Sequence, residues 1–313
     1  MSIKDSIVLM PVRYVWRHCV VLRRELTAWW GNRKFERIPK NKVLPKVLGL
    51  DETMRMILER HLSVSRLGDG EFDAISGGKM IFQQYDNRMV EMLKKVLAHP
   101  VENCLVCIPD VFGDLSAYIR DERYAWRVIM RRRRKQVECL TRGTKVPFGD
   151  AFISRCYLRY RDRGTGSRIF AQWKRLFANR NLLVVEGRYS RLGVGNDLFS
   201  GASSIRRIWC PAVDAFGKYD EIKAVVLANA RKDDLVLLAL GATATILAYE
   251  LAKEGLWAID CGHLDVEYMW MKMGATRKVA IPGRYVSEAA GGQEQVEVVG
   301  EEAANNVVAV VKE

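Results

Sequence analysis

Two acidic residues in the first half of the chain are spaced for metal chemistry. The stretch Arg66-Leu-Gly-Asp-Gly-Glu71 follows a strand-like segment, so Asp69 and Glu71 are predicted to lie in extended backbone. There, residues i and i+2 point the same way with Cα atoms roughly 6–7 Å apart, and both carboxylates can reach one divalent cation that bridges a nucleotide diphosphate. We assign Arg66, Gly68 and Gly70 to the phosphates, because glycine lets a ligand approach the backbone. Asp-Gly-Glu also occurs in ordinary turns, so the motif alone leaves both interpretations open.

A second candidate is a glycine-rich loop directly after a buried strand, which runs from Glu186 to Asp197. Backbone N–H groups and guanidinium forks in such a loop bind phosphate. We therefore assign substrate contacts to Arg191, Gly193, Gly195, Asn196 and Asp197. The loop lacks the Gly-Lys-Ser/Thr ending of a P-loop. The alternative is a plain connection with solvated arginines.

A third candidate is Leu240-Gly-Ala-Thr-Ala-Thr245, where a strand leads into a helix through small and hydroxyl residues. A helix N-terminus attracts anions through its free N–H groups and its dipole, so Gly241 and Thr243 are predicted to contact substrate. Asp260 follows about twenty residues later, as in the dinucleotide fingerprint. However, Thr243 and Ile246 replace the second and third glycines, which makes a dehydrogenase or a methyltransferase the weaker alternative.

A fourth candidate is Asp260-Cys-Gly-His-Leu-Asp-Val-Glu267, again after a strand. Its side chains collect where the ligand is expected, so His263 is assigned to substrate, and Asp265 or Glu267 to activating the acceptor hydroxyl or orienting the donor sugar. Acids in the first turn of a helix also cap it, and this alternative stays open.

Strands that alternate with helices must position these candidates. Short apolar strands are predicted at 63–67, 104–108, 182–186, 205–209, 235–240 and 256–260. Helical spacing covers 51–62, 87–97, 115–139, 220–230, 243–253 and 265–273. This order predicts an α/β fold, a Rossmann-like, mostly parallel sheet flanked by helices. Ligands of such sheets bind beyond the carboxyl ends of the strands, where all four candidates lie.

Composition narrows the classes further. The 313 residues are 49% hydrophobic, which excludes a disordered chain, and no apolar run reaches the roughly 18 residues of a membrane span. Seven cysteines, mostly within apolar segments, indicate a reducing compartment, so we expect a cytoplasmic protein. The Cys104-x-x-Cys107 pair falls in a strand and is better explained as two buried small residues than as a metal or redox site. We interpret the cationic run Arg131–Lys135 as a solvated face and expect no nucleic-acid partner.

The positive charge is concentrated at the N-terminus. Residues 1–47 hold eleven Lys and Arg against three Asp and Glu, +8 of the total +13, together with Trp16, Trp29 and Trp30. Basic residues mixed with Trp and aliphatics suit a helix lying in an anionic membrane surface. We therefore predict a basic, Trp-rich leader that makes peripheral contact with the inner face of the cytoplasmic membrane. The alternative is an amphipathic helix packed on the main domain.

Seven stretches resemble the bacterial GT-D type glycosyltransferases, in the order of that family. They are 65–72, 108–114, 148–155, 185–187 with 190–199, 210–212, 240–245 and 260–267. The resemblance covers residues ~50–285 and implies a Rossmann-like fold, a nucleotide-sugar donor, a divalent metal and transfer of a hexose in bacterial surface-glycan or glycoprotein synthesis. The family's Asp-x-Glu motif falls on Asp69 and Glu71. One departure is Gly241-Ala242, where the family has Gly-Pro.

These observations predict a metal-dependent hexosyltransferase. Asp69 and Glu71 would hold Mn²⁺ or Mg²⁺ against a nucleotide-diphosphate sugar, a UDP-sugar in our prediction, and the acceptor would be a glycan, lipid-linked or on a glycoprotein. The glycosyltransferase domain is predicted at 48–287 and a flexible tail at 288–313. A nonenzymatic sugar-nucleotide sensor, or a scaffold of a polysaccharide assembly complex, is the alternative from another functional class.

Overall fold

The computed structural model describes residues 44–312 except 81–82, 143, 145, 287 and 293–305. The predicted leader at 1–47 therefore lies almost wholly outside the described residues. The strands are β1 (Ser63–Arg66), β2 (Cys104–Ile108), β3 (Gly149–Asp150), β4 (Asn181–Gly187), β5 (Ser204–Cys210), β6 (Asp234–Ala239), β7 (Trp257–Asp260) and β8 (Val307–Val310).

The helices connect these strands. They are α2 (Leu50–Arg60), α3 (Asp69–Ile75), α4 (Asn87–Ala98), α5 (Arg120–Leu140), α6 (Gly164–Phe177), α7 (Tyr219–Asn229), α8 (Ala242–Lys253) and α9 (Leu264–Lys272), with 3₁₀ turns η3 (Ala151–Ser154) and η4 (Ala215–Lys218). None of these helices is both long and apolar enough to cross a bilayer.

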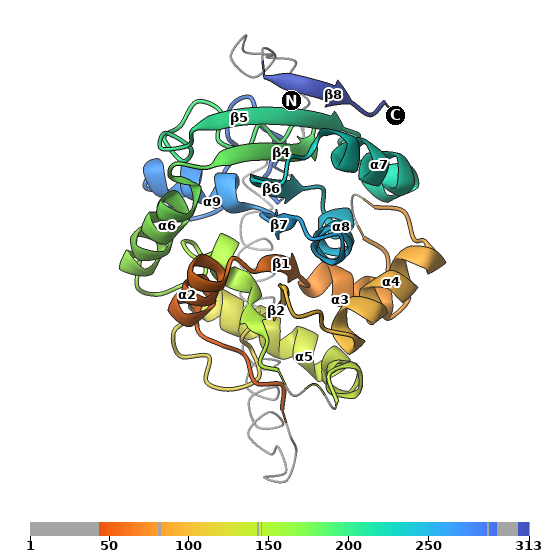
Figure 1. The fold of residues 1–313 in the computed structure, drawn as a ribbon. Coiled ribbons are helices and arrows are strands. Elements are labelled where there is room, and N and C mark those ends of the chain that lie inside the picture. The colour runs from red at the N-terminus through yellow and green to blue at the C-terminus, as the bar shows by residue number, and fades with distance from the viewer. Residues whose placement is uncertain are drawn as a thin grey trace, which may run out of the picture.

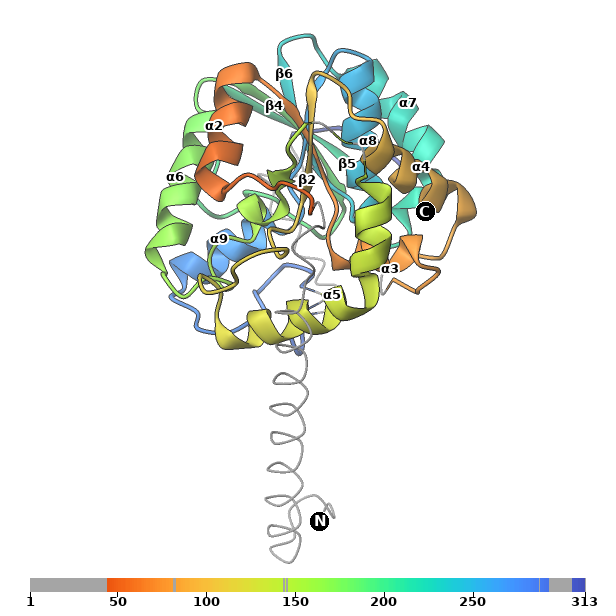
Figure 2. The ribbon, with the colours of Figure 1, turned by 90° about the horizontal axis from the view of Figure 1, so that it is seen from below.

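The strands form one sheet in the order β3-β2-β1-β7-β6-β4-β5-β8, and every pairing between described strands is parallel. Helices α2, α6 and α9 cover one face, and α3, α4, α7 and α8 cover the other (Figures 1 and 2). This three-layer arrangement confirms the predicted α/β fold. Because the inner strands are covered on both faces, β2, β4 and β6 contain continuous apolar runs rather than alternating ones.

The central strands supply the core. Residues 182–187 of β4 are all buried, and β4 pairs along its length with β5 and along most of it with β6. Cys104 and Cys107 of β2 are both buried, as expected for small core residues. Burial raises the pKa of the Cys104 thiol to about 12, which keeps it protonated and unsuited to binding a metal.

Part of the predicted flexible tail is instead structured. Residues 307–310 form β8, the edge strand next to β5, with Ala309 opposite Ile208 and Val310 opposite Trp209. Its residues Val-Val-Ala-Val alternate between partly buried and exposed, as in a half-buried edge strand, and valine favours strands. The prediction of a flexible tail is therefore wrong for 307–310, because a four-residue strand pairing with a neighbour distant in the chain carries little local signal.

The carboxyl ends of β1, β4, β5, β6 and β7 meet at one edge of the sheet, which brings together loops far apart in the chain. Close packing of β3 against β2 and α2 supports this edge. A Cβ atom at Gly149 of β3 would lie 2.5 Å from Sγ of Cys107 and 2.9 Å from Cδ2 of Leu105. Only glycine fits between β2 and α2 at this point.

Gly149→Ala is expected to lower the free energy of unfolding by about 1–3 kcal/mol, because the added methyl overpacks the core. Gly113→Ala is the matched control, since a Cβ there meets nothing within 4 Å. Urea denaturation of both variants measures the difference. Equal midpoints for the two variants would contradict the close packing.

Candidate active site

The two predicted metal ligands lie in the first turn of a helix, not in extended backbone. The extended Gly68 precedes α3, and its N–H donates to Oε2 of Glu71 at 2.7 Å, a capping-box contact. This contact and the two early acids favour a helix start at Asp69, so the predicted extended conformation is wrong. The two side chains nevertheless line one cavity, Asp69 exposed and Glu71 partly buried.

That cavity, the larger of two at this edge, measures about 510 Å³. Burial raises the pKa of Glu71 to about 7, and the nearby charges of Asp260 and Asp69 add to the shift. Because burial disfavours the ionised carboxylate, Glu71 would be stabilised by a bound proton or a bound cation, and Asp69 lines the same cavity. This pairing of a partly buried carboxylate with an exposed one is the observation by which Asp69 and Glu71 fit a divalent metal.

The composition of the cluster indicates which metal. Among the described residues, no group of three or more His, Cys, Asp and Glu could enclose an ion. Mg²⁺ is typically held by one or two carboxylates, with substrate phosphates and water completing the shell, and Mn²⁺ shares the preference for oxygen ligands. Asp69 and Glu71 suit that arrangement, since both offer oxygen ligands.

Arg66, predicted to bind phosphate, mainly joins structural elements. Its Nη2 lies 2.9 Å from Oδ1 of Asp260, its Nε donates to the Asp260 carbonyl at 2.8 Å, and its Nη1 donates to the Ala151 carbonyl at 3.0 Å. The guanidinium passes so close to Gly262 that a Cβ there would lie 1.8 Å from Nη2. Arg66 lines the larger cavity, but the protein itself uses three of its N–H donors.

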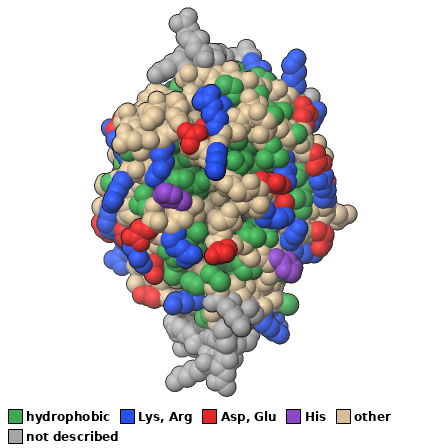
Figure 3. Space-filling model, in the orientation of Figure 1, with side chains coloured by type: hydrophobic (Ala, Val, Ile, Leu, Met, Phe, Trp, Pro, Cys, Tyr) green, Lys and Arg blue, Asp and Glu red, His purple; other side chains and the backbone are tan. Residues whose placement is uncertain are grey.

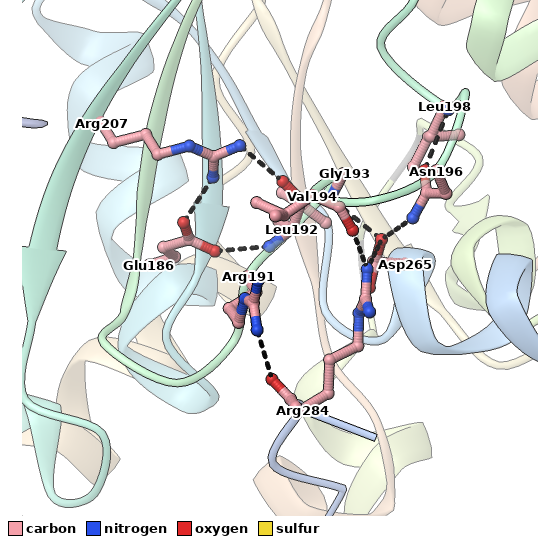
Figure 4. A network of polar contacts seen from close by, with 11 residues as sticks. Glu186, Arg191, Leu192, Gly193, Val194, Asn196, Leu198, Arg207, Asp265 and Arg284 are labelled. Atoms are coloured by element: carbon pink, nitrogen blue, oxygen red, sulfur yellow. Dashed lines mark hydrogen bonds and ion pairs between the residues drawn. The ribbon is translucent and has the colours of Figure 1, made fainter. Parts of the chain in front are cut away.

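The glycine-rich loop is held by carboxylates rather than offering its amides to a ligand. The N–H groups of Leu192 and Gly193 donate to Glu186 (2.7 Å) and Asp265 (2.9 Å) (Figure 4). Arg207 pairs with Glu186 at 2.5 Å and donates to the Leu192 carbonyl. The amide of Gly193, which was assigned to substrate, is therefore not available to phosphate, because a buried acid already accepts from it.

Asp265 and Arg284 fix the other side of the same loop. Asp265 is buried inside α9, lies 2.5 Å from Nε of Arg284 and accepts from Nδ2 of Asn196 at 2.7 Å. Arg284 also donates to the Val194 carbonyl, so the paired side chains of Asp265 and Arg284 both contact the loop (Figure 4). Asp265 lines the smaller cavity, yet its oxygens are engaged by the fold.

Glu267 lies away from both cavities. Its Oε2 accepts from the backbone N–H groups of Tyr157 and Leu158 at 3.1 Å each, and burial raises its pKa. The geometry therefore does not support the predicted role of Glu267 in activating an acceptor. Neither Glu267 nor Asp265 caps its own helix, since α9 has no side-chain cap. Both acids instead hold neighbouring loops.

The remaining loop residues also have structural partners. Asp197 pairs with Lys174 at 2.7 Å and accepts from the Tyr268 hydroxyl at 2.9 Å, and these hydrogen bonds hold its pKa well below its ordinary value. Arg191 has a positive φ of 52° and contacts the Gly283 carbonyl, and Gly195 has φ 69°. None of the three lines either cavity.

The smaller cavity, about 130 Å³, follows β4, β5, β6 and β7 and adjoins the larger one. Its walls include Pro211, Ala212, Val266 and Tyr285. Three residues line both cavities and lie at their junction, namely Gly241, Gly262 and His263. The sequence predicted substrate contact for Gly241 and His263.

The N-terminus of α8 faces this junction. Gly241 is its N-cap, with φ 57° and no side-chain cap, so the amides of the first turn lack a side-chain acceptor. The hydroxyl of Thr243 is buried without a hydrogen-bond partner among the described residues. A helix start of this kind suits an anionic ligand.

Three site residues were missed by the sequence reasoning, namely Arg155, Lys278 and Glu288, which all line the larger cavity. Arg155 follows η3, after a strand of only two residues that no periodicity reveals. The available signal for Arg155 was its position as the last residue of 148–155, one of the seven stretches that resemble the GT-D family. Lys278 and Glu288 follow α9 in a segment with no regular structure.

Comparisons with known proteins identify the family and agree with the fold. The family model described as "Glycosyltransferase GT-D fold" matches residues 64–289. A probable glycosyl transferase Gly of Streptococcus gordonii is 38% identical over 243 residues, covering 77% of this chain and 35% of its own length. Glycosyltransferase GlyD of Streptococcus pneumoniae serotype 4 is 36% identical over 246 residues, covering 78% and 30%. The chain thus spans about a third of the length of these curated relatives.

Solved structures match over their full length. A structure titled as a new glycosyltransferase (DUF1792) from Streptococcus sanguinis has a TM-score of 0.81 at 35% identity, covering 86% of this chain and 100% of its own. A second, titled as domain of unknown function 1792 with a distinct glycosyltransferase fold, has a TM-score of 0.80 at 36% identity, covering 91% and 100%.

Arg284→Met is expected to lower the free energy of unfolding by about 3–5 kcal/mol, because Asp265 would stay buried without its cation. Arg88→Met is the control: it removes an exposed pair with Asp220 and should cost under about 1 kcal/mol. Urea denaturation measures both. If Arg284→Met is as stable as the control, the buried pair does not hold the loop.

Proposed function

Because the chain belongs to the glycosyltransferases of the GT-D fold, we propose that it transfers a hexose from a nucleotide-diphosphate sugar to a glycan acceptor. One observation carries the proposal. The carboxylates of Asp69 and Glu71 line the same cavity as Gly241 at the uncapped N-terminus of α8. Cation ligands and an anion-binding helix end on one cavity suit a metal-bound diphosphate.

The two cavities divide the donor between them. The smaller, with Pro211, Ala212 and Val266 in its walls, takes the nucleoside, which in this proposal is uridine. The diphosphate lies at the junction, next to Gly241. The sugar extends into the larger cavity, whose volume of about 510 Å³ leaves room for an acceptor hydroxyl.

Asp69 and Glu71 would hold Mn²⁺ or Mg²⁺. When bound, the ion supplies positive charge against the diphosphate leaving group. The chain's own residues orient the donor: the first turn of α8 presents N–H groups to phosphate, and the walls of the smaller cavity exclude water from the nucleoside. The acceptor in this proposal is a lipid-linked or protein-linked glycan of bacterial surface polysaccharide synthesis.

The alternatives differ in what they predict. Family membership removes the dehydrogenase and methyltransferase interpretation. A nonenzymatic sensor or scaffold would bind a nucleotide sugar without turning it over, so release of nucleoside diphosphate from a panel of sugar donors separates it from an enzyme.

Asp69→Asn and Glu71→Gln are each expected to lower transfer by at least about 100-fold, because a neutral amide binds a divalent cation weakly. Glu71→Gln keeps an oxygen that can accept from the Gly68 N–H, so the helix start is preserved. The measurement is nucleoside-diphosphate release from UDP-sugars with Mn²⁺, and EDTA should abolish it in the wild type.

The control is Glu91→Gln, which removes an exposed carboxylate of α4 paired with Lys94. It should leave turnover unchanged. Circular dichroism checks that all variants fold. Near-normal turnover by either Asp69→Asn or Glu71→Gln would exclude a metal role for that carboxylate.

We also propose that the chain contacts an anionic membrane. Residues 120–146, which include α5, hold ten Lys and Arg against three Asp and Glu and carry a net charge of +7. The leader carries a net charge of +8. Because the net charge of the whole chain is +13, the remaining residues together are slightly acidic. On the face in Figure 3, basic and acidic side chains are interspersed, which does not suit a nucleic-acid surface there.

Deletion of residues 1–47 is expected to abolish sedimentation with vesicles containing phosphatidylglycerol, because Lys, Arg and Trp of the leader bind anionic lipid headgroups. Neutral phosphatidylcholine vesicles are the control and should bind neither protein. If the shortened chain sediments as the full chain does, the leader is not the anchor.

A further inference from the structure

A carboxylate of the protein already occupies a cationic cluster in the larger cavity. Glu288 accepts from Nη2 of Arg155 at 2.6 Å and from Nζ of Lys278 at 2.5 Å, while Nε2 of His263 lies 3.5 Å from its Oε1. All four side chains line the cavity that contains Asp69 and Glu71. Three groups from separate segments therefore converge on one internal anion.

His263 contributes a neutral N–H to this cluster. Its Nδ1 lies 2.7 Å from Nη2 of Arg155. A guanidinium can only donate, so Nδ1 accepts and the ring proton sits on Nε2, toward Glu288. Burial, with the charge of Arg155 as the next cause, lowers the pKa of His263 to about 3, so the ring is neutral near pH 7.

The charge of the cluster exceeds that of its occupant. Arg155 and Lys278 carry two positive charges against the single negative charge of Glu288. Nη1 of Arg155 is buried and has no hydrogen-bond partner among the described residues. Two other cations at this edge are engaged elsewhere, since Arg66 pairs with Asp260 and Arg159 pairs with Glu122. The cluster thus has charge and a donor to spare.

A phosphate group suits these donors better than one carboxylate does. One oxygen of Glu288 accepts from Arg155 and the other from Lys278, which leaves none for Nη1 of Arg155. A phosphate group has more oxygens and carries up to two negative charges, so it can accept from Lys278 and from both terminal nitrogens of Arg155. Burial raises the pKa of Glu288, but the positive charge of Arg155 and the hydrogen bond from it outweigh burial and hold that pKa well below its ordinary value. Glu288 is therefore ionised, and it competes with any anion for the cluster.

Glu288 is presented on a short turn whose base is fixed. Arg284 is anchored to Asp265, and the N–H of Tyr285 donates to the Tyr189 carbonyl at 3.2 Å. Further hydrogen bonds close the turn. The N–H of Val286 donates to the Gly292 carbonyl, and the N–H of Gly292 donates to the Ala289 carbonyl. Since these described residues on either side of Glu288 are hydrogen-bonded, we expect the carboxylate to leave the cluster by rotation of its own side chain.

We infer that Arg155, Lys278 and His263 form a phosphate subsite, and that Glu288 is its internal occupant, displaced when substrate binds. The inference rests on the proposed function, because it assigns the phosphate to the donor diphosphate or to a phosphate on a lipid-linked acceptor. In either case the bound ligand gains the contacts that Glu288 gives up, so the carboxylate lowers apparent affinity by the fraction of time it occupies the subsite.

Glu288→Gln tests this displacement. Removal of the competing charge should lower the Kd measured by calorimetry by at least about fivefold. The probes are UDP and geranyl diphosphate, a soluble prenyl diphosphate, each with Mg²⁺ and full-length protein. Tighter binding of UDP alone assigns the subsite to the donor, and tighter binding of geranyl diphosphate alone assigns it to the acceptor. A gain for both probes supports a subsite that takes either phosphate.

Glu254→Gln is the matched control, because it removes an equal charge from a surface pair with Lys223 at the other end of α8. It should not change either Kd. Lys278→Met, a partly exposed site that should fold, is expected to weaken the binding of the same probe by about threefold to tenfold. The double variant of Glu288 and Lys278 should lose most of the gain.

Unchanged or weaker binding of both probes by Glu288→Gln would overturn the inference, since Glu288 would then not compete with phosphate. The same holds if Glu288→Gln binds as the wild type does but turns over more slowly, because the carboxylate would then act on transfer. Donor turnover by the wild type is measured separately, so failure of the proposed function is distinguished from failure of the subsite.

Discussion

The ion pair between Arg66 and Asp260 joins the two halves of the sheet, and the candidate site depends on it. Strands β1 and β7 share one register pair, Val64 opposite Ile259, so few backbone hydrogen bonds link them. Arg66 spans this seam, and the Thr245 hydroxyl donates to the Arg66 carbonyl at 2.8 Å. Because the carboxylates of α3 follow β1 while the ends of α8 and α9 belong to the other half, these contacts set their relative positions.

Buried carboxylates elsewhere at this edge serve the fold in a similar way. Glu186 accepts from the backbone N–H of Leu192 in the loop that directly follows its strand, whereas Asp265 and Glu267 accept from backbone N–H groups of loops distant in the chain. A buried charge is costly unless it is paired and hydrogen-bonded, and Arg207 and Arg284 meet that condition for the first two. The irregular loops around the cavities are thereby held rigid, as a site that must recognise one donor geometry requires.

The acids at this edge of the sheet have two different roles, one in the fold and one in the cavity. Carboxylates used for the scaffold are nearly inaccessible, whereas Asp69 is exposed and Glu71 is only partly buried beside the larger cavity. In the same cavity, Arg155 and Lys278 outnumber the carboxylate of Glu288 between them. A cavity lined by both acids and cations suits a ligand that brings both a metal ion and phosphate.

The sequence by itself determined the layered α/β fold, because apolar runs and helical spacing are local signals, and it placed the Asp69-x-Glu71 motif, Gly241 and His263 at the carboxyl edge. It did not determine the helical setting of Asp69, the edge strand β8, or the roles of Asp265, Glu267 and the glycine-rich loop. Only the tertiary structure decided these, since an acid that follows a strand has the same local pattern whether it faces a ligand or a buried amide. The partner that settles the role of such an acid comes from another segment of the chain, as Gly193 does for Asp265 and Tyr157 for Glu267.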